Sequence, residues 1–209
     1  MRDFAAQTVA TGATSIDLQA VLDGGLCLVR LPKGVLGDET VRLLGSFVVA
    51  KCWQAAAARA RLGLPRRDAS LVIDECHNVL TLPIGLEEML AEARAYRLSL
   101  VLAHQNLAQM PPDLREGISA NARNKLIFSV SPEDARQLER HTLPALGAHD
   151  LSHLGAFQAA ARLTVGSAEQ PACTLATRPL PEPVPGRASA IRAAIATRPA
   201  PHPVRVSPK

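Results

Sequence analysis

A short apolar run that ends in two adjacent acids, LVIDEC at residues 71–76, constrains the fold of this chain more than any other feature. The run Leu71–Ile73 is uninterrupted, which is typical of a strand buried on both faces of a parallel sheet. Asp74 and Glu75 follow at the carboxyl end of that strand. In open α/β sheets this edge is where ligands bind, so carboxylates there can meet a ligand instead of staying unpaired in a core. The sequence therefore predicts an α/β fold with a ligand site at this edge.

Two adjacent carboxylates suit a nucleotide bound with Mg²⁺, because this ion prefers oxygen ligands and keeps several of its waters. We predict that Asp74 holds Mg²⁺ through its hydration shell and that Glu75 orients the attacking water. This is the layout of a Walker B strand. A strand followed by an acidic helix cap is the alternative, and both interpretations fit these six residues equally well.

A second apolar strand, Ser99–Ala103, leads into His104 and Gln105. A polar amide beside a Walker B strand can contact the γ-phosphate or the attacking water, so Gln105 is the predicted sensor. The alternative is an ordinary polar loop residue. Between the two strands, Leu86–Tyr96 has strong helix formers and apolar residues at helical spacing. A strand, helix and strand joined by a right-handed crossover, and hence a parallel pair, are expected.

Hydrophobic patterns and turn signals predict the remaining elements. These are a helix at 16–22, a strand at 26–31, a long helix at 38–62, a strand at 125–130, a helix at 131–141 and a closing hairpin of 157–165 with 172–176. The long helix is expected to bury Leu43, Leu44, Phe47, Val48 and Trp53.

A Walker A loop is missing from all 209 residues. Such a loop needs G-x-x-x-x-G-K-[ST]. The glycine loop at 32–37 is followed instead by Asp38 and Glu39, whose charges would repel a phosphate. The missing loop argues against catalysis by this chain alone, and the sequence leaves open whether the chain is an enzyme.

Composition divides the chain into three parts: a linker or truncated end at 1–15, a folded part at 16–178 and a tail at 179–209. The tail holds eight prolines in 31 residues and is predicted to be disordered. The net charge of +4 arises from residues 178–209, because residues 1–177 have a net charge of −1. Bulk charge therefore gives no argument for nucleic-acid binding.

Metal, disulfide and membrane signals are weak. The four cysteines are far apart and lack zinc-finger spacing, so we expect reduced thiols, and Cys76 with His77 does not make a metal site. No apolar stretch is long enough to span a membrane and no signal peptide is recognisable. A cytoplasmic protein is expected.

The stretch from Leu71 to Leu138, with its paired acids and the Ala103–Gln105 strand end, resembles the C-terminal part of HerA/FtsK-superfamily ATPases. It is most similar to the type IV secretion coupling proteins of conjugation, the TraD/TraG-like, TraM-recognition-like class. The resemblance covers about residues 15–178. It implies a RecA-like (P-loop NTPase) parallel sheet flanked by helices, in a motor that forms a ring, usually a hexamer, and moves DNA with ATP and Mg²⁺.

The resemblance also implies residue roles. Asp74 and Glu75 match Walker B, and Gln105 matches the sensor. Arg94 falls where related proteins often carry an arginine just before the sensor strand. It is therefore a candidate for the arginine finger that reaches the γ-phosphate of a neighbouring subunit, with Arg97 and Arg123 as rivals. For each arginine the alternative is a solvated helix surface.

The family's Walker A lies upstream of the matching region, so a truncated gene, a split gene or a fragment of a longer product would each explain its absence. The leading hypothesis is a DNA-translocation ATPase module that cannot hydrolyse ATP alone. Its expected partners are further copies in a ring or a Walker A-bearing chain, DNA, and membrane secretion-channel components at the inner face of the membrane. One alternative is a non-catalytic module that docks on a complete ATPase ring. A DExH helicase fragment is a weaker alternative, because the Asp74–His77 box lacks that group's later motifs.

Overall fold

The computed structural model describes residues 16–63, 65–80 and 86–196. Its helices are α2 (Leu18–Leu22), α3 (Lys33–Leu36), α4 (Asp38–Arg61), α5 (Leu86–Glu92), α6 (Pro112–Asn121), α7 (Pro132–Leu138), α8 (Ala148–Ser152) and α9 (Arg187–Ala196). Short 3₁₀ turns are η1 (Cys76–Asn78), η2 (Leu107–Gln109) and η3 (Glu139–His141). The strands are β1 (Ala69–Ile73), β2 (Leu98–Leu102), β3 (Lys125–Ile127), β4 (Gln158–Arg162), β5 (Thr164–Val165), β6 (Ala168–Glu169) and β7 (Cys173–Ala176).

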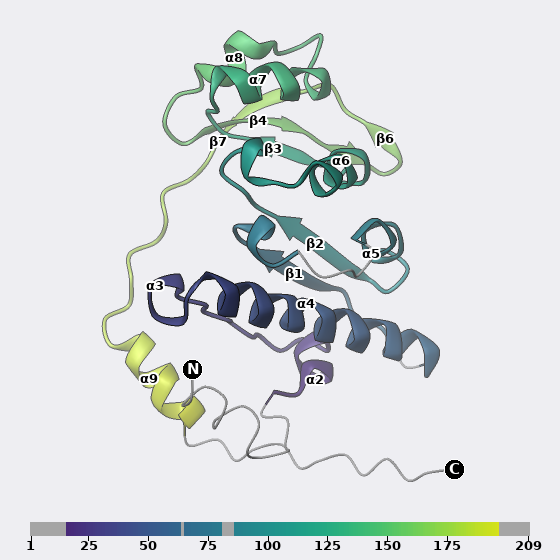
Figure 1. The fold of residues 1–209 in the computed structure, drawn as a ribbon, viewed down its shortest axis with the longest axis vertical. Coiled ribbons are helices and arrows are strands. Elements are labelled where there is room, and N and C mark those ends of the chain that lie inside the picture. Colours follow the sequence, from purple (N-terminus) through teal and green to yellow (C-terminus); the bar gives the residue numbers. More distant parts are fainter. Residues whose placement is uncertain (1–15, 64, 81–85, 197–209) are drawn as a thin grey trace.

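The elements are arranged in layers (Figure 1). The long helix α4 lies along the β1–β2 pair, and the β3–β4–β7 sheet lies beyond that pair, with α7 and α8 on its far side. Two hydrophobic clusters centre on the two sheets, one around Ile73 and Met89 and the other around Ile127 and Leu151. Leu138 packs against both clusters, so α7 links the two layers.

β1 and β2 form the predicted parallel pair, with Ala69 opposite Leu98 and Ile73 opposite Leu102. The side chains of Leu71 and Leu100 turn toward the core below the pair. On the other face, Val72 is 66% exposed and Val101 50%. The prediction that the β1 strand is buried on both faces is therefore wrong for this structure, since described helices cover only one face.

Helix α4 confirms the predicted long helix but buries a different face. Asp38 and Glu39 lie in its first turn and Arg59 and Arg61 in its last, which suits the helix dipole at both ends. Its buried residues are Val41, Gly45, Ser46, Val49, Ala56 and Arg59. Leu43 and Phe47, which we expected to be buried, are half-exposed. Apolar residues occur on all sides of α4, so helical spacing alone did not select the buried face.

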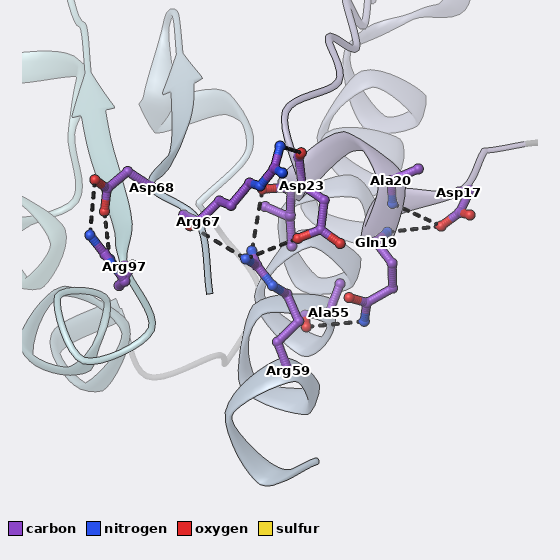
Figure 2. A network of polar contacts seen from close by, with 10 residues as sticks. Asp17, Gln19, Ala20, Asp23, Ala55, Arg59, Arg67, Asp68 and Arg97 are labelled. Carbon is purple, nitrogen blue, oxygen red and sulfur yellow. Dashed lines mark hydrogen bonds and ion pairs between the residues drawn. The ribbon is translucent and has the colours of Figure 1, made fainter. Parts of the chain in front are cut away.

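A polar network around Arg59 fixes α2, α4 and the approach to β1 (Figure 2). The Arg59 side chain is only 2% exposed and forms an ion pair with Asp23 at 3.1 Å. It also donates to the backbone carbonyls of Leu22 and Arg67, both at 3.4 Å. Arg67 in turn donates to the Asp23 carbonyl at 3.1 Å. The chain that enters β1 is thereby held to α4.

In the second sheet, β4 lies between β3 and β7 and is antiparallel to both, which confirms the closing hairpin. The strand predicted at 125–130 is present but ends at Ile127. Ser131 caps α7 by accepting the Asp134 N–H at 3.2 Å.

Two predicted segments differ in the structure. Residues 26–31 form no strand: they find no partner strand in the described ranges, and Leu26 and Leu28 are 83% and 85% exposed. The segment 179–209, predicted to be disordered, contains α9, whose alanine-rich sequence favours a helix between the proline clusters. Residues 197–209 and the predicted linker at 1–15 lie outside the described residues. Within the described ranges, no helix is long and apolar enough to cross a membrane.

Candidate nucleotide-hydrolysis site

The β1–β2 pairing continues past the ends of both strands. The Ala103 N–H donates to the Ile73 carbonyl at 2.9 Å, and the Cys76 N–H donates to the Ala103 carbonyl at 2.9 Å. These two bonds hold the segment carrying Asp74 and Glu75 against the segment that leads to Gln105. The sheet thus brings the predicted Walker B acids and the predicted sensor to one edge.

Glu75 and Gln105 are in direct contact. The Gln105 side-chain amide donates to a Glu75 carboxylate oxygen, with 2.5 Å between Nε2 and Oε1. Glu75 adopts a left-handed backbone conformation, with φ 49° and ψ 50°. This region is unfavourable for a residue with a Cβ and often marks functional sites. The turn that ends β1 therefore stores strain at the residue we predict to orient water.

Two histidines and a thiol surround this pair. His77 Nδ1 lies 3.5 Å from the second Glu75 oxygen, and the buried Nδ1 of His104 has no hydrogen-bond partner among the described residues. Burial lowers the pKa of His104, while Asp134 acts in the opposite direction. The ring is therefore neutral at pH 7. Burial raises the pKa of the Cys76 thiol to about 11, so this thiol stays protonated and is a poor metal ligand.

Asp74 is exposed at the sheet edge, and its Oδ1 accepts the Glu75 N–H at 3.0 Å. Its second carboxylate oxygen is available to the water shell of a cation. The part of the chain that the structure describes holds no group of three or more His, Cys, Asp or Glu side chains that could bind a metal directly. A hydrated Mg²⁺ held by one carboxylate fits this arrangement, because such an ion keeps most of its waters.

The candidate arginines lie elsewhere. Arg94 follows α5 in the turn before β2, at the strand end opposite Gln105, and its side chain is exposed. Arg97 is held by both Asp68 oxygens, at 2.8 and 3.2 Å. Arg123 donates to the Ser167 carbonyl at 3.2 Å. The structure does not bring Arg94 to the Glu75–Gln105 pair, and its action on a neighbouring subunit stays a prediction.

Sequence analysis missed one residue that supports the site. Asp134 is buried, and its Oδ2 accepts the backbone N–H of Leu107 at 3.0 Å. Leu107 follows Gln105 by two residues, so Asp134 holds the loop that carries the predicted sensor. No sequence signal indicates this contact, because the two residues are 27 positions apart.

A second set of contacts that the sequence does not indicate supports the turn after Glu75. Lys33 donates to the Asn78 side chain at 2.8 Å, and Ser46 donates to the Val79 carbonyl at 2.6 Å. Lys33, in the glycine loop that we rejected as a phosphate cradle, therefore supports the turn after Glu75.

Comparison with known proteins gives one family and one fold. Residues 68–141 match the family described as the TraM recognition site of TraD and TraG. The structure resembles the plasmid coupling protein TrwB in complex with a non-hydrolysable GTP analogue, with a TM-score of 0.61 at 17% sequence identity. The match covers 77% of this chain and 43% of TrwB. TrwB in complex with ADP and Mg²⁺ matches equally well, with a TM-score of 0.61 at 17% identity, over 77% of this chain and 42% of that one.

A more distant similarity is to the genome packaging NTPase B204 from Sulfolobus turreted icosahedral virus 2, in complex with ATP-γS. Its TM-score is 0.51 at 17% identity, over 76% of this chain and 72% of that one. A search of curated proteins found no significant match.

At these identities the structural matches establish the fold and not the activity. The fold is that of RecA-like P-loop ATPases, as the sequence predicted. The chain spans less than half the length of the TrwB structures that it matches. The family match over residues 68–141 confirms the predicted resemblance to the TraD/TraG class.

Proposed function

We propose that residues 16–178 are the Walker B and sensor module of a DNA-translocation ATPase of conjugation, and that this module does not hydrolyse ATP alone. The hydrogen bond between Glu75 and Gln105 at the carboxyl edge of the parallel pair carries the proposal. Residues 30 positions apart are joined where an ATPase needs its water-orienting acid and its sensor.

Each residue has a role that its geometry supports. Asp74, exposed at the edge, holds a hydrated Mg²⁺, which when bound neutralises charge on the phosphate oxygens. Glu75 accepts a hydrogen bond from the attacking water and orients it. Gln105 donates to Glu75 without nucleotide, and its amide can exchange this contact for the γ-phosphate or the water. The left-handed turn at Glu75 positions its side chain, and the hydrogen bond between Asp134 and Leu107 positions the loop that carries Gln105.

Charge explains why the module needs a partner. Asp74 and Glu75 place two carboxylates at the site, and a triphosphate would be repelled unless cations offset them. A Walker A loop supplies a lysine and backbone N–H groups for this purpose, and the 209 residues contain no such motif. We propose that a Walker A-bearing segment, meaning an apolar strand that leads into G-x-x-x-x-G-K-[ST], completes the site from a longer polypeptide or a partner chain.

The similar proteins support the rest of the proposal. TrwB has been observed with ADP and Mg²⁺, B204 is a genome packaging NTPase, and the matched family is named for recognition of TraM. We propose accordingly that the complete motor is a ring, that it acts on DNA at the cytoplasmic side of a secretion channel, and that Arg94 acts on the nucleotide of the neighbouring subunit.

Equilibrium binding of a fluorescent ATP analogue with Mg²⁺ tests this function. We expect no Mg²⁺-dependent binding by the chain alone and clear binding once it is joined to a Walker A-bearing segment. Asp74→Ala should weaken that binding, whereas Asp113→Ala, at an exposed acid of α6, should not. Tight binding by the chain alone would disprove the need for a partner, and no binding by the joined form would favour the non-catalytic docking module.

A further inference from the structure

The segment between α2 and α3 runs along helix α4, in the direction opposite to that helix (Figure 1). At its start, Leu22 packs in one cluster with Ala56, and the Leu22 carbonyl accepts a hydrogen bond from Arg59 at 3.4 Å. At its end, Leu31 lies against Gly45, because a Cβ placed on this glycine would be 3.3 Å from Leu31 Cδ1. These two contacts fix the course of the residues between them.

Cys27 lies in the middle of this segment and is turned toward α4. Leu26 and Leu28 on either side of it are strongly exposed, whereas Cys27 is partly buried. Alternating exposure is typical of an extended chain in which every second side chain faces a neighbouring element. The Cys27 thiol is therefore directed to the helix and the two leucines to solvent.

Cys52 lies on the face of α4 that receives the segment. It follows buried Val49 by three residues, on the same stripe of the helix as buried Gly45. Cys27 precedes Leu31 by four residues, which an extended chain spans in about 13 Å. Seven residues separate Gly45 from Cys52, a rise of about 10 Å along the helix. The two cysteines therefore lie at nearly the same level of α4.

The pKa of Cys52 is a second sign of this proximity. Burial, followed by the nearby Cys27 thiol, raises the pKa of Cys52. Both thiols are free. A disulfide needs Cα atoms within about 7 Å of each other. No backbone hydrogen bond ties residues 26–31 to another segment within the described ranges, so the segment can shift toward α4 without breaking one.

We propose that Cys27 and Cys52 are a redox-active thiol pair, which a low-molecular-weight disulfide such as oxidised glutathione converts into a reversible disulfide. Cys27 loses its proton to solvent and attacks one sulfur of the oxidant, whose S–S bond breaks. Cys52 then loses its proton and attacks the Cys27 sulfur of the mixed disulfide. Each of the two released thiolates takes up a proton, so two protein thiols are oxidised and one glutathione disulfide is reduced. In a reducing compartment such a bond is transient and responds to the redox state.

Peptide mass spectrometry tests the pairing. The 209-residue chain is incubated with oxidised glutathione, its remaining thiols are blocked, and it is digested without reductant. We expect the Cys27–Cys52 disulfide to exceed the glutathione adduct on Cys27 by roughly tenfold or more, because the second attack is intramolecular. Exposed Cys173 should carry glutathione only, and dithiothreitol should restore the free thiols.

Two variants provide the controls. In Cys52→Ala, glutathione should stay on Cys27, because the thiol that displaces it is missing. Cys173→Ala should leave the Cys27–Cys52 disulfide unchanged. Free thiols at both positions, or separate glutathione adducts on Cys27 and Cys52 in the wild type, would overturn the proposal.

Limited proteolysis measures what the disulfide does to the segment. Arg30 is exposed, and trypsin cleavage after it requires residues 26–31 to move away from α4. Oxidation should slow this cleavage by roughly fivefold or more in the wild type and not in Cys52→Ala. Cleavage after exposed Arg187, at the start of α9, is the internal control and should not change. Unchanged cleavage after Arg30 in the disulfide form would show that the bond does not tie the segment to α4.

Discussion

The buried carboxylate of Asp134 accepts the backbone N–H of Leu107 at 3.0 Å. This bond crosses from the start of α7 to the loop after β2, and so joins the layer of β3, β4 and β7 to the layer of β1 and β2. It also holds the loop that carries Gln105. The position of Gln105 relative to Glu75 therefore depends on a residue from the second sheet layer.

Replacing Asp134 with Ala leaves the buried Leu107 N–H without an acceptor, and we expect a loss of about 1–3 kcal/mol in the free energy of unfolding. Asp134→Asn keeps an oxygen acceptor and should lose less. Glu133→Ala, at the exposed preceding position, should change stability by less than about 0.5 kcal/mol. Urea unfolding measures all three, and equal losses for Asp134→Ala and Glu133→Ala would show that the bond is not structural.

Glu75→Gly should stabilise the fold by up to about 1 kcal/mol, because glycine adopts the left-handed conformation at φ 49° without strain. The partly exposed hydrogen bond to Gln105 is lost in exchange and should offset only part of this gain. Thermal unfolding of the variant measures the difference. A clear drop in stability would mean that Glu75 is retained for folding and not for function.

Arg59→Ala should destabilise the chain by about 2 kcal/mol or more, because it removes a buried side chain that bonds Asp23 and two backbone carbonyls (Figure 2). Arg61→Ala, at an exposed position two residues later, is the matched control and should have little effect. Urea unfolding of the two variants gives the comparison. Similarly small losses in the free energy of unfolding for both variants would show that the network does not support β1.

A pH effect is expected from His141, which accepts or donates a hydrogen bond with Ser119 at 3.0 Å. Burial, followed by the nearby charges of Lys125, Arg140 and Arg162, lowers the pKa of His141 to about 4, with Glu169 acting in the opposite direction. Between pH 6.5 and 4 the unfolded chain binds a proton here and the folded chain does not. The free energy of unfolding therefore falls as the pH drops from 6.5 to 4.

Comparison of wild type with His141→Gln isolates this contribution. The wild type should lose more stability than the variant between pH 6.5 and 4, and the two curves should run parallel above pH 7. Chemical unfolding at several pH values gives the curves, and identical slopes for wild type and His141→Gln would contradict the expectation.

The parallel pair and the site edge were predictable because their signals are local. An apolar run that stops at Asp74, a helical pattern after it and a second run that stops near Gln105 specify a strand, a helix and a strand. The same topology places both strand ends at one edge. The contact between Glu75 and Gln105 then follows from the register of the pair.

Other features depend on residues far apart in the sequence or on partners. Apolar residues surround α4, so the buried position of Arg59 and the exposure of Phe47 were not predictable from spacing. The strand expected at 26–31 has the right composition but pairs with no other strand in the described structure. Asp134 contacts Leu107 only because the two layers pack together, and no hydrophobic periodicity in the sequence indicates that contact.

In our proposal, Glu75 and Gln105 form a catalytic pair that works only with a Walker A loop in place. Mg²⁺-dependent ATP hydrolysis is therefore to be measured for the chain alone and for the chain joined to a Walker A-bearing segment. We expect no hydrolysis above background by the chain alone. We expect hydrolysis by the joined form, and Glu75→Gln should lower it by roughly 100-fold or more while ATP binding persists. Hydrolysis by the isolated chain, or full activity of the joined Glu75→Gln variant, would contradict it.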